Sequence, residues 1–453
     1  MAIHTAFARA ATRLTDWTQR WVPGTFTIAW LLTLIVLLLG VTAGHASFLT
    51  CVSAWGDGFW ELLPFSMQMC LIMFTGSIVA VSPPVGRALA WLASRPRTPR
   101  QSILLVALGS MMLALVHWGI SIVGSAVLVR ELGRRRAGVD YRLLLAAAYL
   151  GMGTTWHAGL SASAPLLVAT PGHFLESEIG IIPVSETIFA PFNLILVALV
   201  VLLFSIVTPL LHPAPAETVE ATPAQLESIH MFRPPRPPTA VERPAPATRL
   251  EYSRWVNLTF GALALVWVVD YVFMRPQHAV TLNALNFVML GLAVALHPSA
   301  ASLVGAAEEA SGLVFGIILQ FPLYAGMYGI IRETHLAEAL AGVFVAGATA
   351  RTYPLIVYWY SGIVNYFVPS GGSKWAIEAP YILSAGQTLG VPAAKVVTAY
   401  AWGDMMTDII QPFWAIPLLA AAKLDFREIL GFCLILFCVY APLVSLAFLL
   451  FPR

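Results

Sequence analysis

Charged residues are scarce in this sequence. Only 11% of its 453 residues are Asp, Glu, Lys or Arg, whereas 58% are hydrophobic. Because soluble globular domains contain about 25% charged residues, an ordinary soluble domain is excluded. The composition therefore predicts a polytopic membrane protein in contact with lipid. The net charge of +2 says little by itself, and no nucleic acid partner is expected.

Cysteines and catalytic motifs are also scarce. Cys51, Cys70, Cys433 and Cys438 show no CxxC spacing, so neither a disulfide framework nor a metal site is expected. The HExxH and GxSxG signatures of zinc proteases and serine hydrolases do not occur, and we expect no enzyme activity and no cofactor. The first apolar run lacks a signal-peptide cleavage pattern and is predicted to remain as a helix.

Long apolar runs are what the sequence does contain. Runs of about 20 residues, enough to cross a bilayer about 30 Å thick, occur at 23–44, 62–81, 192–211, 258–273 and 430–450. Three arginines precede the first run, whereas the loop after it contains no Lys or Arg; they are Arg9, Arg13 and Arg20. Because cytoplasmic loops collect basic residues, the N-terminus is predicted to be cytoplasmic.

Basic clusters lie on both sides of the apolar segment 101–133. They are Arg87, Arg95, Arg97 and Arg100 before it, and Arg130, Arg134, Arg135 and Arg136 at its end. Because one straight span would leave one cluster outside, we predict a re-entrant hairpin whose tip lies near residues 118–124. Two short complete spans are the alternative.

The next apolar segment, 141–170, is interrupted by glycine, serine and proline. This composition predicts a broken helix with exposed backbone donors and acceptors, as in discontinuous transporter helices. Close helix packing through small residues is the alternative. His173, in the acidic loop that follows, is predicted to be solvated. Residues 213–254 are rich in Pro, Ala, Thr and Glu and predict a partly extended cytoplasmic linker.

The second half of the chain repeats features of the first. Ala148-Tyr149 and Ala399-Tyr400 each precede a Gly-containing break and then a similar motif, APLLVA at 164–169 and IPLLAA at 416–421. With spans at 255–273, 282–296 and 302–331, a second hairpin at 352–388 would enter from the side opposite to the first. A second broken helix is predicted at 395–422.

These features predict an all-α polytopic membrane protein. We expect an inverted-repeat transporter with two opposed re-entrant hairpins and two broken helices. Residues 1–212 form the first membrane repeat in this prediction, and 213–254 form the linker. Residues 255–453 then contain one extra helix and the second, inverted repeat.

Residues 365–380, NYFVPSGGSKWAIEAP, place polar groups between apolar segments. A small carboxylate needs hydrogen-bond donors for its oxygens, and a turn at the start of a helix provides hydroxyl and backbone N–H groups. The predicted donors of this turn are Ser370, Gly371, Gly372 and Ser373. Lys374 would add positive charge. Alternatively, Lys374 and Glu378 neutralise each other at their i,i+4 spacing.

Further candidates come from the first hairpin and from the two helix breaks. The predicted substrate-binding residues there are Ser121, Gly124, Ser125, Trp156, His157, Ser161, Ser163 and Gln411. A helix-packing seam is the alternative for the hairpin residues. Because carboxylates inside a membrane are costly, the acids are predicted to bind a coupling H⁺ or Na⁺. For one of Asp404 and Asp408, a role as a helix cap or interface residue is the alternative. The predicted coupling-ion residues are Asp404, Thr407, Asp408 and Glu378. His117 and His157 are either proton carriers or hydrogen-bonded structural residues.

Several motifs resemble the short-chain fatty acid transporter family of bacteria, within the ion transporter superfamily. They are VPSGGSKW at 368–375, QPFWAIP at 411–417, WGDGFW at 55–60, ATPG at 169–172 and WGD at 402–404. The resemblance implies a cytoplasmic-membrane carrier of small carboxylates such as acetoacetate or butyrate. It also implies two re-entrant hairpins, a scaffold that dimerises and an elevator-like motion. The chain departs from the family pattern at Met406 and Asp408, where Trp and Asn are commoner.

The predicted function is secondary active transport of a short-chain carboxylate by alternating access, coupled to H⁺ or Na⁺. The expected partners are the carboxylate, membrane lipid and a second copy of the chain. Carriage of another small organic anion, such as a dicarboxylate or hydroxy acid, is the alternative, and a channel is a further one. The predicted location is the bacterial inner membrane.

Overall fold

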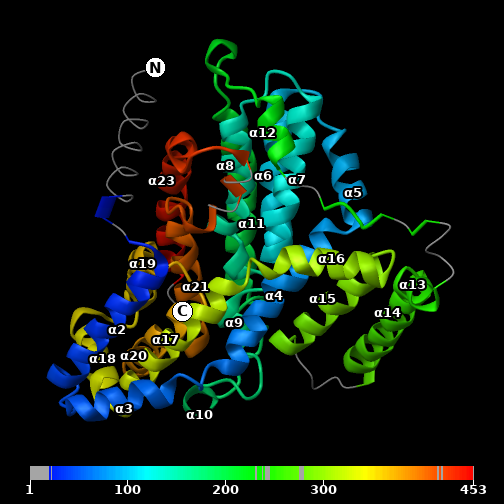
Figure 1. The fold of residues 1–453 in the computed structure, drawn as a ribbon. Helices are drawn as coiled ribbons and strands as arrows, with labels where there is room; N and C mark the ends of the chain where they lie inside the picture. The colour runs from blue at the N-terminus through cyan, green and yellow to red at the C-terminus, as the bar shows by residue number, and fades with distance from the viewer. Residues whose placement is uncertain are drawn as a thin grey trace.

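A computed structural model of the chain describes residues 20–21, 23–229, 232–236, 238–239, 245–274, 280–415, 418–419 and 422–451. Within these residues the structure is helical and contains no β-strand (Figure 1). The prediction of an all-α protein is therefore confirmed. Arg9 and Arg13, and four residues of the motif at 416–421, lie outside the described residues.

Five helices in the described part of the chain are long and apolar enough to cross a membrane. They are α4 (Leu63–Val81), α6 (Pro99–Val116), α11 (Pro191–Leu210), α14 with its final π turn (Arg254–Met274) and α23 (Phe426–Leu450). The span expected at 302–331 is instead a pair of helices, α16 (Ala300–Ser311) and α17 (Phe315–Glu333), bent by 51°. Gly312, a poor helix former, lies directly after α16 and favours this interruption.

Two sets of helices pack in the same pattern. Helices α4, α5 (Pro83–Ala93), α6, α7 (Trp118–Arg135) and α8 (Tyr141–Thr154) correspond to α17, α18 (Leu336–Gly347), α19 (Tyr353–Phe367), α20 (Ser373–Thr388) and α21 (Ala393–Asp408). The contacts of α7 with α4 and α5 match those of α20 with α17 and α18, and α6 packs on α8 as α19 packs on α21. The chain therefore contains a structural repeat.

The two helices that precede each set in the chain pack on the other set. Helices α2 (Thr25–Thr42) and α3 (Phe48–Gly58) pack on α17 of the second set. In the same way, α15 (Leu282–Leu296) and α16 pack on α4 of the first set. Each half therefore completes the other.

The corresponding helices α8 and α21 run in opposite directions, as their positions along α11 demonstrate. The backbone N–H of Asp140, just before α8, donates to Nε2 of His212, just after α11, at 3.2 Å. In contrast, Nζ of Lys395, at the start of α21, lies 3.3 Å from the ring centroid of Phe192, at the start of α11. Because α8 begins beside the end of α11 and α21 begins beside its start, α8 and α21 are antiparallel.

Each set contains a helical hairpin and a broken helix. Helices α6 and α7 form the first hairpin, with His117 between them, and α19 and α20 form the second, with residues 368–372 between them. After α8 the chain forms a 3₁₀ turn at Trp156–Ala158 and restarts as α9 (Ser163–Leu167). After α21 it forms a 3₁₀ turn at Phe413–Ala415. Helix α8 continues through Gly151 and Gly153 and ends at Thr154, within the segment rich in glycine and serine.

The first part of the linker is docked rather than free. The N–H of Val219 donates to Oδ2 of Asp140 at 3.0 Å, and the N–H of Tyr141 donates to the carbonyl of Val219 at 2.7 Å. A short helix follows, α12 (Pro223–Ser228), in which Leu226 is buried against Gly133 of α7. Nε of Arg130 donates to the carbonyl of Leu226 at 3.1 Å. Residues 213–229 therefore belong to the folded body at the base of the first hairpin.

Candidate functional site

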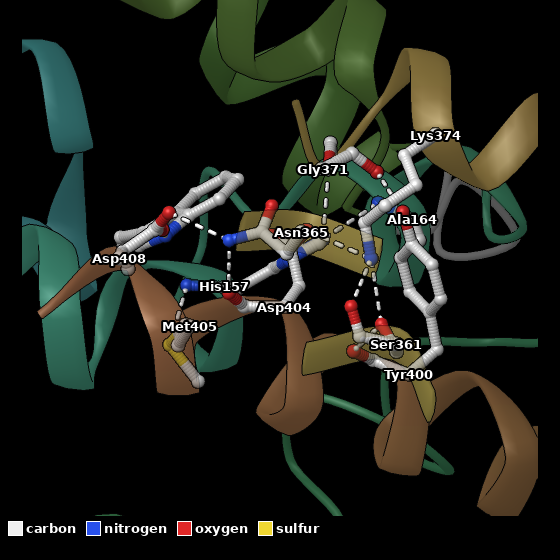
Figure 2. A network of polar contacts seen from close by, with 12 residues as sticks. His157, Ala164, Ser361, Asn365, Gly371, Lys374, Tyr400, Asp404, Met405 and Asp408 are labelled. Atoms are coloured by element: carbon white, nitrogen blue, oxygen red, sulfur yellow. Dashed lines mark hydrogen bonds and ion pairs between the residues drawn. The ribbon is translucent and has the colours of Figure 1, made fainter. Parts of the chain in front are cut away.

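Three helices of the second set each carry two polar side chains four residues apart, and the three pairs meet in one buried region. Helix α19 contributes Ser361 and Asn365, α20 contributes Lys374 and Glu378, and α21 contributes Asp404 and Asp408. Residues four apart lie on one helix face, which explains why each pair points the same way. We call this group the Asp404 cluster; its other buried members are His157, Tyr400, Thr407 and Gln411. Figure 2 shows His157, Asn365, Lys374 and Tyr400 around Asp404.

Lys374 makes one close ion pair and two hydrogen bonds. Its Nζ lies 3.1 Å from Oδ1 of Asp404, and it donates to Oγ of Ser361 at 2.6 Å and to the Ser361 carbonyl at 3.1 Å (Figure 2). Glu378 is farther away, with Oε1 3.9 Å from Nζ. In this conformation the Lys374 ammonium therefore makes two hydrogen bonds to Ser361 and an ion pair with Asp404. Its nearest charged partner is Asp404, from another helix, rather than Glu378 from its own.

His157 links the first broken helix to Asp404. Its Nδ1 lies 2.8 Å from Oδ2 of Asp404, and its Nε2 lies 2.8 Å from Oγ of Ser163. The backbone N–H of Ala164 donates to Nε2 at 3.2 Å. Because an N–H cannot accept, Nε2 carries no proton, so His157 is neutral and its Nδ1–H donates to Asp404.

Asp408 accepts hydrogen bonds from three uncharged donors. Nδ2 of Asn365 donates to Oδ1 at 2.8 Å, and Nε2 of Gln411 donates to the same oxygen at 3.2 Å. The indole N–H of Trp156 donates to Oδ2 at 3.1 Å. Thr407 adds a bond from its hydroxyl to the carbonyl of Gly362 at 2.7 Å. This carboxylate is therefore held without a cation beside it.

The tip of the second hairpin, residues 368–372, touches both broken helices. The hydroxyl of Tyr400 donates to the carbonyl of Gly371 at 2.7 Å. A Cβ at residue 371 would lie 2.7 Å from Asp404 Oδ2 and 2.7 Å from His157 Cε1, so only glycine fits there. The hydroxyls of Ser370 and Ser373 hydrogen-bond each other. Ser370 is half-buried, whereas Gly371 and Gly372 are buried.

Comparison with known proteins gives the family. The sequence model of a family described as short chain fatty acid transporter matches residues 6–451. A relative from Escherichia coli is 36% identical over 421 residues, covering 93% of this chain and 94% of the relative. A relative from Haemophilus influenzae is 33% identical over 444 residues, covering 96% and 98%. Both are provisionally named short-chain fatty acid transporters. The chain belongs to the short-chain fatty acid transporter family. The resemblance found in the sequence motifs is thereby confirmed.

Two solved structures show that the fold of this family member is that of known transporters. The YdaH transporter of Alcanivorax borkumensis superimposes with a TM-score of 0.59 at 17% identity, covering 94% of this chain and 98% of YdaH. MtrF of Neisseria gonorrhoeae superimposes with a TM-score of 0.59 at 15% identity, covering 98% and 96%. Together with the apolar helices, the family shows that the chain is a multi-pass membrane protein with a transport function.

The first hairpin of the transporter contributes no member of the Asp404 cluster. Ser121 donates to the carbonyl of Ser110 at 2.7 Å, inside the hairpin itself. Gly124 faces Leu113, and Ser125 is buried on the same helix. Ser161 accepts a hydrogen bond from the N–H of Trp118 at 2.9 Å and so joins the hairpin to the first helix break.

The two hairpins make corresponding hydrogen bonds, but only the second hairpin makes one of them with a charged side chain. Oγ of Ser110 donates to the carbonyl of Ala147 at 2.8 Å, as Oγ of Ser361 donates to that of Tyr400 at 3.1 Å. Ser121 then donates to the Ser110 carbonyl, as Lys374 donates to that of Ser361. A serine in the first repeat thus has the place of the lysine in the second.

Phe65 is a neighbour of the tip that sequence reasoning missed. Its Cζ lies 2.8 Å from where a Cβ on Gly372 would be, and its ring centroid lies 5.9 Å from that of Phe321 and 6.3 Å from that of Phe174. A phenylalanine within the apolar span α4 gives no signal of this role in the sequence. These rings form an apolar surface beside the polar tip.

His173, expected to be solvated, is instead buried in its loop. The N–H of Leu175 donates to Nδ1 at 3.3 Å, and Nε2 lies 3.1 Å from the carbonyl of Gly180. Burial lowers the pKa of His173. The prediction was wrong because the loop 171–190 folds back on itself, which its acidic composition does not indicate.

Proposed function

We propose that this transporter carries a short-chain monocarboxylate across the bacterial cytoplasmic membrane by secondary active, alternating-access transport. The observation that carries the proposal is the charge of the Asp404 cluster. Three buried carboxylates, Asp404, Asp408 and Glu378, share one ammonium, Lys374. Buried charges are costly unless paired, so such a group favours binding of a further cation. This cation, H⁺ or Na⁺, would couple transport to an ion gradient, as symport.

The substrate carboxylate would bind at the tip of the second hairpin. Ser370 and Ser373 supply hydroxyls, and the N–H groups of Gly371, Gly372 and Ser373 precede the first full turn of α20, where no helical acceptor exists. The apolar surface around Phe65 would hold the alkyl tail. Lys374 would reach the anion when its bond to Asp404 opens. The remaining proposed contacts are Trp156, His157, Ser161, Ser163 and Gln411, with Ser121, Gly124 and Ser125 from the first hairpin.

The coupling cation would bind among Asp404, Thr407, Asp408 and Glu378. These side chains lie on α20 and α21, adjacent to the proposed substrate donors. A cation there would lower the cost of bringing an anion to the tip, because the two charges offset each other. Binding of the two would therefore be mutually favourable.

The proposed motion uses the two hairpins as opposed re-entrant gates. Helices α2 to α4 and α15 to α17 would be the scaffold, which dimerises, and the hairpins and broken helices would move against it as an elevator. The packing of α4 and α17 beside the hairpin helices α7 and α20 supports this division. The N-terminus and the linker would face the cytoplasm, since the linker contacts the arginine-rich end of α7.

Uptake into proteoliposomes tests the proposed function. Purified protein is assayed with labelled butyrate and acetoacetate under separately imposed proton and Na⁺ gradients. Protein-free liposomes give the passive flux of neutral acid, which is subtracted. Gradient-driven accumulation of either acid is expected. Absence of uptake for every monocarboxylate of two to six carbons overturns the proposal, and uptake of a dicarboxylate or hydroxy acid in their place identifies another anion as the substrate.

A further inference from the structure

Glu378 differs from every other carboxylate of the Asp404 cluster. Its side chain is 1% exposed. Neither of its oxygens accepts a hydrogen bond from any residue in the described part of the chain. Its closest charged partner is Lys374, at 3.9 Å, and Lys374 already bonds Asp404 at 3.1 Å. An ionised carboxylate in this setting is poorly compensated, because it has lost water and gained no donor.

The other two carboxylates each accept at least one hydrogen bond, which Glu378 does not. Asp404 faces Lys374 through Oδ1 and accepts the Nδ1–H of His157 through Oδ2. Asp408 accepts three N–H bonds, as described above. Hydrogen bonds to a carboxylate favour its charged form, whereas burial without them favours the protonated form. Among the three acids, Glu378 is therefore the one whose charged form is favoured by no hydrogen bond.

The groups facing Glu378 also argue against a metal cation there. Lys374 and Tyr381 lie on its own helix, α20, while Asp404 and Tyr400 come from α21. Tyr360 approaches from α19. A Na⁺ ion bound to Glu378 would lie beside the Lys374 ammonium and be repelled by it. A proton instead binds one carboxylate oxygen covalently and removes the charge.

We propose that the coupling ion of this transporter is H⁺ and that Glu378 is the residue that carries it. The inference rests on the proposed function, which leaves the ion open. Glu378 takes up a proton from one side of the membrane and releases it to the other. One proton and one substrate anion then enter together, so the loaded carrier has the same net charge as the empty one. Because their net charges are equal, the loaded and the empty carrier can both move through the same apolar surroundings.

Replacement of Glu378 by glutamine tests the assignment, because glutamine imitates the protonated acid. The assay compares two modes in proteoliposomes: accumulation of labelled acetoacetate driven by a proton gradient, and exchange of internal unlabelled for external labelled acetoacetate. Exchange needs no net proton movement. Glu378→Gln is expected to lose at least tenfold of the gradient-driven accumulation and to retain exchange within about threefold of wild type, and Glu378→Asp is expected to restore a gradient response.

The matched control is Glu308→Gln, which makes the same chemical change on an exposed position of α16. It is expected to behave as wild type in both modes. Accumulation driven by Na⁺ but not by protons in wild type overturns the inference, as does full proton coupling in Glu378→Gln. Uncoupling by Asp408→Asn with coupling intact in Glu378→Gln also overturns it. If wild type transports no monocarboxylate in either mode, the proposed function fails instead, and the two failures are thereby distinguished.

Discussion

At the scale of single residues, the close contact at Gly371 decides how the hairpin tip meets the broken helices. The Gly371 carbonyl accepts a hydrogen bond from the Tyr400 hydroxyl, and a Cβ added at this position would meet Asp404 and His157. A larger residue cannot keep both contacts, because the neighbouring atoms belong to charged or hydrogen-bonded groups. The Asp404 cluster thus depends on a residue that has no functional group of its own.

Gly371→Ala is expected to reduce uptake at least tenfold, because the added methyl would lie 2.7 Å from Asp404 Oδ2 and His157 Cε1. Overpacking of this kind costs about 1–3 kcal/mol. The measurement is initial uptake rate together with thermal unfolding in detergent. Gly86→Ala is the control, since nothing lies within 4 Å of its added methyl. Normal uptake by Gly371→Ala would contradict the geometry of the tip.

The pair of Lys374 and Asp404 leads to a second expectation at this scale. Lys374→Met leaves Asp404 buried without its cation and is expected to lower stability by about 3–5 kcal/mol. The double variant Lys374→Met/Asp404→Asn removes both charges and is expected to be more stable than Lys374→Met alone. Thermal unfolding of the purified proteins measures this, with exposed Lys423→Met as the control. A double variant less stable than the single one would show that the pair is not coupled.

At the scale of elements, the first part of the linker is structural. Its Pro-rich composition predicts a partly extended connection and gives no sign of docking, yet Val219 pairs with the start of α8 and Leu226 is buried on α7. Few apolar residues are needed for this docking, because Gly133 provides a recess for the leucine side chain. Composition averaged over the linker does not reveal one such residue.

Leu226→Ala is expected to release this segment, since truncating a buried leucine costs about 2–5 kcal/mol. Faster hydrogen exchange at residues 217–228 and faster proteolysis there are the expected results, with little change in the distant helix α14. Leu250→Ala is the control because Leu250 is 64% exposed in the short helix α13 (Pro246–Glu251). Equal exchange in the two variants would mean that Leu226 does not anchor the segment.

At the scale of the whole molecule, the exchange of α2–α3 and α15–α16 between the two helix sets makes the halves interdependent (Figure 1). Each half alone would expose the faces of α4 or α17 that the other half covers. Residues 1–240 and 241–453, expressed separately, are therefore expected to be degraded or aggregated. When co-expressed, they are expected to co-purify and to transport. A stable, monodisperse half would contradict the interdependence.

Much of the architecture could be predicted from sequence because hydropathy and propensity act locally. The length of the apolar runs predicted the main spans, and the glycine- and serine-rich composition of 141–170 predicted that this segment is interrupted, as it is after Thr154. The bend between α16 and α17 was missed, because Gly312 is a weak signal within an apolar run. The exchange of helices between the halves was also missed, since no local pattern encodes which helix packs on which.

The sequence by itself determined that this is a multi-pass helical membrane protein with polar breaks, and its motifs determined the family. It also placed Lys374 and Glu378 on one helix face, because i,i+4 spacing is a property of the helix alone. Only the tertiary structure decided that Lys374 bonds Asp404, that His157 bonds the same carboxylate and that Glu378 has no hydrogen-bond donor in the described residues. These partners come from helices far apart in the chain, and their meeting depends on how α19, α20 and α21 pack.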